Sequence, residues 1–158
     1  MSKRVRTSLP DDEYLCLIGQ LAYMVTSMEG LLIFDLPGLK AYLPDDLSPE
    51  ALAGKTTGVI GQRLVKDGER IVDDDVRRYI RTGGQHLEAV SEIRNHMLHS
   101  RPATIEGAQV LYRWRPATND YFAITNDWLQ NQIDQIEKLM IELTSLRPLH
   151  KHAAFKDA

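Results

Sequence analysis

Apolar residues recur at helical spacing through most of the chain. In residues 10–34 they form one broad stripe, and further stripes run through residues 48–66, 73–99 and 125–146. Apolar positions three and four apart share one face of a helix, so the pattern predicts a main helix over each of these four ranges.

Two segments interrupt this helical pattern. Gly83 and Gly84 lie within the third stripe, and a glycine inside a helix costs about 1 kcal/mol relative to alanine. We therefore expect a kink or break there, followed by a separate helix over residues 85–100. Residues 109–115 and 121–124 are rich in strand-forming residues and flank a turn-like segment, which predicts a β-hairpin.

These elements together predict the fold class. Long helices joined by modest connections pack as a bundle, so we expect an all-α bundle of four to five helices with a small β-hairpin before the last helix. No repeat or linker divides the chain. This indicates a single domain over residues 1–158, with a frayed tail from about residue 147.

Composition and targeting signals narrow the compartment. The chain has 158 residues, 43% hydrophobic and 26% charged, as in ordinary globular domains. Its single cysteine, Cys16, falls in an apolar helical pattern, so we expect a core position for it and no intramolecular disulfide. We identify no secretory signal and no apolar stretch that approaches the roughly 20 residues needed to span a bilayer. The expected location is the cytoplasm, without a membrane partner.

Charge is distributed unevenly along the chain. The net charge is −3, which does not suggest a general nucleic-acid binder. Residues 77–115, however, hold seven arginines against three acidic residues, a local balance of +4. Phosphate recognition depends on such local potential, although a solvated arginine-rich face has the same composition. Both interpretations stay open at this point.

The end of the third helical stripe carries the most informative polar residues. On a helical wheel Arg94 falls inside the apolar arc, whereas Asn95 and His99 share the polar side with Ser91. A guanidinium directed at an apolar surface needs an acceptor, because burying it unpaired costs several kcal/mol. It either pairs with a buried carboxylate, for which Glu29 of the first helix is the candidate, or is held ready for an anion.

Two other chemical motifs are incomplete. Residues 53–58 contain Gly-Lys-Thr, but a nucleotide-binding loop also needs a glycine at position 49, which is proline here. His96 and His99 lie three positions apart with Glu92 one turn earlier, yet no further ligand completes a metal site. We therefore expect neither a metal nor a cofactor.

Arg94-Asn95, three spacer residues and His99 resemble the arginine–polar–spacer–histidine motif of HEPN domains. HEPN domains are helical bundles of prokaryotic immunity, toxin–antitoxin pairs and RNA processing. The position of the motif on the third main helix, with a hairpin before the last helix, is similar as well. The resemblance implies a metal-independent endoribonuclease that acts as a homodimer, with the two motifs meeting across the interface.

The resemblance also implies residue roles. His99 would be the general acid or base, Arg94 would bind the scissile phosphate, and Asn95 would orient one of them. The products would be a 2′,3′-cyclic phosphate and a 5′-hydroxyl, and the cellular role that of a toxin or antiviral effector with an antitoxin or regulatory partner. This chemistry suits the residue types, because histidine exchanges protons near neutral pH and arginine's planar fork fits a phosphate. Supporting positions would be Glu29, Ser91 and His96.

Three alternatives remain beside the ribonuclease. In the first, Arg94 forms only a structural ion pair. In the second, the chain is a non-catalytic dimeric HEPN-like binding or regulatory module, and in the third it is an unrelated bundle. The hairpin leaves a further choice open. Arg113, Trp114 and Arg115 could grip and stack nucleic acid, or the tryptophan could pack on the bundle.

Overall fold

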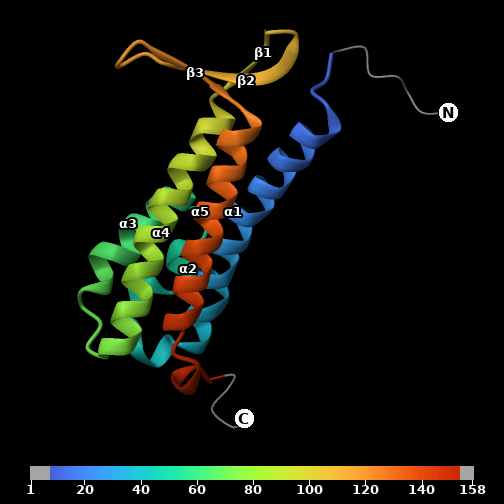
Figure 1. Cartoon of the computed structure of the whole chain (residues 1–158). Coiled ribbons are helices and arrows are strands. Elements are labelled where there is room, and N and C mark those ends of the chain that lie inside the picture. Colours follow the sequence, from blue (N-terminus) through green and yellow to red (C-terminus); the bar gives the residue numbers. More distant parts are fainter. Residues whose placement is uncertain (1–7, 154–158) are drawn as a thin grey trace, which may run out of the picture.

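The computed structural model describes residues 8–153. Its main elements are α1 (Asp12–Gly38), α2 (Pro49–Leu52), α3 (Thr57–Gly68), α4 (Asp74–Leu98), β1 (Arg101–Ile105), β2 (Ala108–Arg115), β3 (Asp120–Ile124) and α5 (Asn126–Leu146). Short 3₁₀ turns lie at Lys40–Tyr42, Asp45–Leu47 and Leu149–Lys151. The long helices α1, α4 and α5 lie side by side, α2 and α3 cover one side, and the sheet lies at one end (Figure 1).

Side chains just before the helices fix where they begin. Asp11 accepts a hydrogen bond from the Tyr14 amide at 2.8 Å, and Thr125 accepts one from the Trp128 amide at 3.1 Å. The first amides of a helix have no carbonyl partner within it, so these side chains replace the missing acceptors.

The all-α fold class predicted from the sequence is wrong. Helices make up 68% of the structure, but the chain after α4 forms a three-stranded antiparallel sheet in the order β1-β2-β3. The arrangement over residues 8–153 is therefore mixed α/β. The expected hairpin is present as β2 and β3, which pair Arg115 with Asp120 and Leu111 with Ile124. The strand that the sequence did not reveal is β1.

Pro102 explains why β1 is hard to recognise. Proline lacks an amide hydrogen and commonly ends a helix, yet an edge strand tolerates it. β1 is an edge strand of this sheet. Glu106 and Gly107 join β1 to β2 with φ angles of 51° and 83°, and two positive φ angles are what a two-residue hairpin turn requires.

Two helix predictions also need correction. The stripe over 48–66 is divided into α2 and α3, because the chain leaves the helix near Gly54, whose φ is 74°. The break predicted at Gly83 and Gly84 is absent, and α4 is one helix of 25 residues. A Cβ on Gly84 would lie 2.8 Å from the carbonyl oxygen of Gly61. The glycine is thus required by the close approach of α3 to α4 and does not end the helix.

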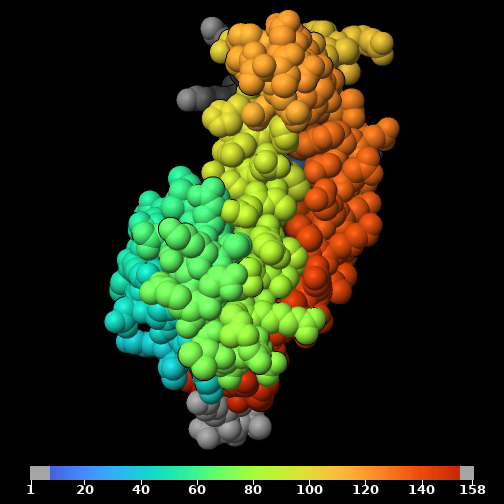
Figure 2. Space-filling model, turned by 90° about the vertical axis from the view of Figure 1, so that its left-hand side faces the viewer, coloured from blue at the N-terminus to red at the C-terminus, as the bar shows by residue number. Residues whose placement is uncertain are grey.

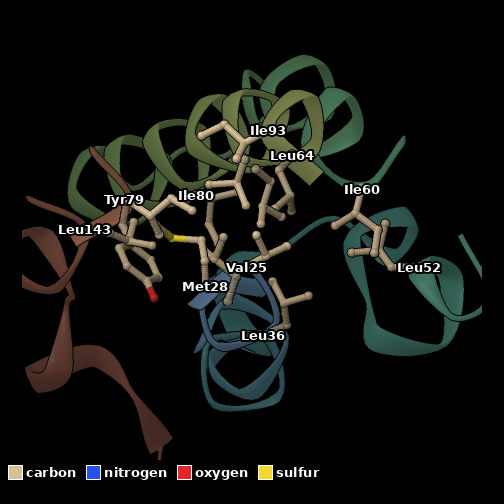
Figure 3. Close-up of a cluster of buried hydrophobic side chains, with 14 of the residues drawn as sticks. Val25, Met28, Leu36, Leu52, Ile60, Leu64, Tyr79, Ile80, Ile93 and Leu143 are labelled. Carbon is tan, nitrogen blue, oxygen red and sulfur yellow. The ribbon is translucent and has the colours of Figure 1, made fainter. Parts of the chain in front are cut away.

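A continuous hydrophobic core joins the long helices to α3. Figure 3 shows Val25 and Met28 of α1 facing Ile80 of α4, with Leu64 of α3 and Leu143 of α5 around them. Each of these side chains is buried. Burying one side chain of this size contributes about 1.5–3 kcal/mol, so apolar packing fixes how the helices lie.

The segment after α5 packs against the bundle. The Asp35 carboxylate is fully buried and accepts hydrogen bonds from the Tyr79 hydroxyl and from Arg147 Nε, each at 2.6 Å. The fraying expected from about residue 147 therefore does not describe residues 147–153, and residues 154–158 lie outside the described part of the chain.

The outer face of α1 is unusually apolar. It exposes Tyr23, Phe34 and also Cys16, for which a core position was expected. An 18-residue window of α1 has a mean hydropathy of 1.5 and is 22% buried, so this helix has the length and composition of a membrane span, which the sequence was not expected to contain. One such helix is weak evidence for a membrane, because the core helix of a soluble protein meets the same criterion.

One tyrosine hydroxyl fixes the sheet to α1. Tyr14 donates a hydrogen bond to the carbonyl oxygen of Ile124 at 2.7 Å and accepts one from the Leu111 amide at 2.8 Å. Its side chain is buried, and burial raises the pKa of the hydroxyl, which therefore keeps its proton. This pair of bonds joins β2 and β3 to the first turn of α1.

Candidate functional site

The residues of the HEPN-like motif lie at the carboxyl end of α4, next to the sheet. Figure 2 shows α3, α4 and α5 side by side on one face, with the sheet beyond the end of α4. Arg94 and Asn95 lie near the end of α4, and His99 directly follows the helix. The His99 amide donates to the Asn95 carbonyl oxygen at 3.1 Å, so the last turn holds His99 in place.

Arg94 is directed toward α3 and α1. Its Nη1 donates a hydrogen bond to Thr57 Oγ1 at 3.0 Å, and the Thr57 hydroxyl donates to Glu29 Oε2 at 2.5 Å. A hydroxyl can accept one hydrogen bond while donating another, so Thr57 connects the guanidinium to the carboxylate. Thr57 is 3% exposed, which keeps water from replacing it.

Glu29 is therefore near Arg94 but is not its direct partner. Arg94 forms no ion pair with a carboxylate among residues 8–153, and its Nε is buried without a hydrogen-bond partner. The ion pair expected from the sequence is replaced by a relay through Thr57. Sequence reasoning missed Thr57 because it begins α3, in a stretch that the pattern assigned to the middle of a longer helix.

Asn95 and Ser91 line a groove between α3 and α4. The groove has a volume of about 580 Å³, and Glu88 and Glu92 also line it. Ser91 is 7% exposed, so Asn95 is the more accessible of the two polar groups. Carboxylates repel a phosphate, so this groove is poorly suited to an RNA backbone.

His99 lies on a different groove, formed by the end of α4 and the sheet. This groove has a volume of about 590 Å³, and its lining contains two arginines, Arg101 and Arg113, but no carboxylate. His99 is exposed, and its imidazole has no hydrogen-bond or ion-pair partner within the described range 8–153. A histidine in this setting is accessible to an anionic ligand.

His96 is packed inward. Its Nε2 lies 3.2 Å from Arg115 Nη2, and its ring contacts the rings of Phe122 and Trp128 edge-on, with centroids 5.4 and 6.0 Å away. Burial, together with the charges of Arg113 and Arg115, lowers the pKa of His96. Its imidazole is therefore neutral near pH 7 and holds the sheet against α4.

The arginines of the hairpin and its tryptophan have different environments. Arg113 donates a hydrogen bond to the Asn95 carbonyl oxygen, and the guanidinium of Arg115 lies 5.1 Å from the centroid of the Phe122 ring. Arg113 therefore connects the sheet to α4, and Arg115 does so through His96. Trp114 does not pack on the bundle: it is 51% exposed and stacks on Tyr121.

Within one chain the three residues of the motif have three different environments. Arg94 is held toward Thr57, whereas Asn95 lines the acidic groove and His99 the basic one. Sequence reasoning missed Arg101 as a groove residue, although it falls in the arginine-rich window. Only the register of the sheet reveals it: Arg101 pairs with Tyr112 and therefore lies on the same face of the sheet.

The remaining histidines do not form a metal centre. His86 and His152 are buried, with 7% and 4% of their surface exposed. Over residues 8–153 no group of three or more histidine, cysteine, aspartate or glutamate side chains is placed to hold a metal ion.

No protein-family model, curated protein or solved structure matches this chain. The resemblance to HEPN domains therefore depends on the motif and its position alone.

Proposed function

We propose that this protein is a metal-independent endoribonuclease of the HEPN type that acts as a cytoplasmic homodimer. The observation that carries the proposal is the environment of His99. Its exposed imidazole has no partner among the described residues and lies on a groove with Arg101 and Arg113 and without a carboxylate. A phosphodiester is attracted to such a groove and brings its 2′-hydroxyl within reach of a proton-accepting histidine.

Cleavage then needs no metal. A histidine removes the proton from the 2′-hydroxyl, and the 2′-oxygen attacks the adjacent phosphorus. The bond to the 5′-oxygen breaks, and this oxygen takes a proton from a second histidine, leaving a 2′,3′-cyclic phosphate and a 5′-hydroxyl. Each chain supplies one His99, so a two-fold dimer supplies the acid and the base together.

Arg94 has the charge that the phosphorane-like transition state requires, and Asn95 offers an amide to orient it. In the single chain Arg94 is bonded to Thr57 and does not face the groove of His99. The dimer must therefore bring Arg94 to the phosphate from a second copy, or the side chain must leave Thr57. Glu29 would act through Thr57 as a positioning residue.

The first experiment incubates the purified chain with single-stranded RNA in excess chelator and identifies the termini of the products. Wild type should yield cyclic phosphate ends, and His99→Ala should reduce cleavage at least a hundredfold, as expected for loss of general acid–base catalysis. The matched control is His150→Ala, an exposed histidine after α5. Equal loss of activity in both variants, or cleavage that disappears with chelator, would contradict the proposal.

A mixing experiment tests the shared site. Wild type and His99→Ala subunits are unfolded, combined at known ratios and refolded. If one cleft needs both imidazoles, activity falls with the square of the wild-type fraction. A linear decrease would show that each subunit acts alone.

The bonding of Arg94 favours a second candidate function, a non-catalytic dimeric binding or regulatory module. An arginine engaged with Thr57 is what a structural role requires. In that case wild type cuts no RNA, and His99→Ala weakens only association between subunits or with a protein partner. A role as toxin or antiviral effector, with a neutralising partner, applies to the nuclease and predicts growth arrest on expression that His99→Ala abolishes.

A further inference from the structure

Three aromatic rings form a continuous stack on one face of the sheet. Tyr121 stacks on Tyr112 with centroids 5.8 Å apart and planes 23° apart, and on Trp114 at 6.1 Å and 17°. Trp114 and Tyr121 are directly opposite each other in the β2–β3 register. Tyr112 is two positions before Trp114, so strand alternation places it on the same face. We call these three residues the aromatic platform.

Two of the three rings of the platform are exposed, although neighbouring aromatic residues are not. Trp114 is 51% and Tyr121 is 54% exposed, whereas Phe122 and Trp128 pack against the core. The Trp114 Nε1 bonds to the side chain of Asn119 at 3.3 Å, which orients the indole at the surface. Exposed large aromatic rings in a contiguous group are typical of a binding surface, because leaving them in water forgoes their burial energy.

Cationic side chains border the same platform. The groove lined by the three rings also contains Arg101 and His99, and it has no carboxylate in its lining. Arg101 has no hydrogen-bond or ion-pair partner anywhere in residues 8–153, so its guanidinium is available. Flat rings beside a free guanidinium match a ligand that carries planar bases and phosphates on one chain.

We propose that the aromatic platform binds unpaired bases of single-stranded RNA, with Arg101 on an adjacent phosphate. A duplex keeps its base faces stacked internally, so only an unpaired strand can offer them to Tyr121 and Trp114. The inference rests on the proposed function, because it names the substrate of the groove that His99 shares. It would place a stacked base next to the phosphodiester whose neighbouring 2′-hydroxyl His99 deprotonates.

The binding test uses oligonucleotides that cannot be cleaved. The chain has two tryptophans, so Trp128→Phe leaves Trp114 as the only indole and makes its fluorescence specific for the platform. A 2′-O-methyl RNA dodecamer should quench this fluorescence, and added salt should weaken binding. A blunt-ended duplex of the same strand with its complement should bind at least tenfold more weakly. Equal binding of duplex and single strand would overturn the proposal.

Substitutions in the otherwise wild-type chain identify the residues that contact the RNA. Binding of a fluorescently labelled dodecamer is measured by fluorescence anisotropy. Trp114→Ala and Tyr121→Ala should each weaken binding by about tenfold, the loss expected for one base–aromatic stack. Arg101→Gln should weaken binding and reduce the salt dependence. The control is Tyr23→Ala, which removes a 75% exposed tyrosine on α1 and should change nothing. A loss shared by Tyr23→Ala, or no loss in the platform variants, would overturn the proposal.

Single-stranded DNA of the same sequence tests whether the unpaired bases that bind belong to RNA or to DNA. Tighter binding of RNA shows that the 2′-position is recognised, whereas tighter binding of DNA contradicts RNA as the ligand. The two proposals can also fail separately. If RNA binding depends on the platform residues but natural RNA is not cleaved, the platform proposal stands and the nuclease proposal fails. If RNA is cleaved but Trp114→Ala and Tyr121→Ala leave the KM unchanged, the nuclease proposal stands and the platform proposal fails.

Discussion

Arg94 and Thr57 are joined by a hydrogen bond of 3.0 Å, and the same Thr57 hydroxyl donates to Glu29. One buried oxygen therefore connects a guanidinium on α4 to a carboxylate on α1. The connection keeps Arg94 in a fixed direction and gives Nη1 of its guanidinium an acceptor, although Nε remains buried without a partner.

The relay predicts a specific loss of stability. Thr57→Val keeps the shape of the side chain but leaves Arg94 and Glu29 without their shared partner. The free energy of unfolding should fall by about 1–3 kcal/mol, as when buried polar groups lose a hydrogen bond. Thr57→Ser should retain most of the stability. Chemical denaturation measures both, and Thr56→Val, at the exposed neighbouring position, serves as the control. A Thr57→Val variant as stable as wild type would contradict the relay.

The close contact of α3 and α4 predicts opposite effects of the same substitution at two glycines. Gly84→Ala would place its Cβ 2.8 Å from the backbone oxygen of Gly61, which cannot move aside without shifting α3. It should destabilise the fold by about 1–3 kcal/mol. Gly30→Ala, with nothing within 4 Å of its Cβ, should instead stabilise α1 by up to about 1 kcal/mol. Thermal unfolding of the two variants measures both changes in stability. A change of the same sign in both variants would show that packing does not explain Gly84.

The sequence predicted the long helices better than the sheet that follows α4. Helical spacing located α1, α4 and α5, and strand formers located β2 and β3. Propensity alone misplaced a break at Gly83 and Gly84, because a helix accepts glycines where another backbone approaches closely. β1 escaped notice because its proline is acceptable only at an edge, and edges are defined by tertiary structure.

The candidate site was predicted in composition but not in arrangement. The helical wheel directed Arg94 inward and His99 outward, and the structure has Arg94 toward Thr57 and His99 exposed. The wheel could not supply Thr57, since it lies on another helix. Arg101 and Tyr121 were also beyond reach, because only the register of the sheet brings them to the groove of His99.

The attachment of the sheet depends on the Tyr14 hydroxyl. Tyr14→Phe leaves the Ile124 carbonyl and the Leu111 amide without this partner, which should cost about 1–3 kcal/mol. Hydrogen exchange at the Leu111 amide should become faster than exchange in the core of α4. Tyr23→Phe, at an exposed tyrosine, is the matched control. Unchanged protection of Leu111 would show that the sheet is held by other contacts.

Acidification should lower the free energy of unfolding through His86 and His96. Burial lowers the pKa of His86, whose Nε2 lies 3.2 Å from Glu142, and burial and neighbouring arginines lower the pKa of His96. The unfolded chain, with histidine pKa values of about 6.5, therefore binds protons first. The contribution of these histidines to the free energy of unfolding should be complete above about pH 6.5 and should decrease as the pH falls below this value.

Melting curves between pH 7 and pH 5 test this expectation in wild type and in His86→Gln. The variant should show a smaller decrease in Tm over this range, because one of the two imidazoles with a lowered pKa is gone. The same substitution at exposed His150 should leave the decrease unchanged. A Tm that rises on acidification in wild type would reverse the sign and contradict the buried, neutral state of these histidines.

The bond between Tyr14 and Ile124 also affects how the chain matures during synthesis. The two residues are 110 positions apart. Closing so long a loop comes late in folding, since the distant partner must first exist and then be found. A nascent chain that ends before Ile124 has neither the complete sheet nor the acceptor for Tyr14. The surface beside His99 is therefore assembled only after synthesis has passed Ile124, and chains truncated before Ile124 lack it.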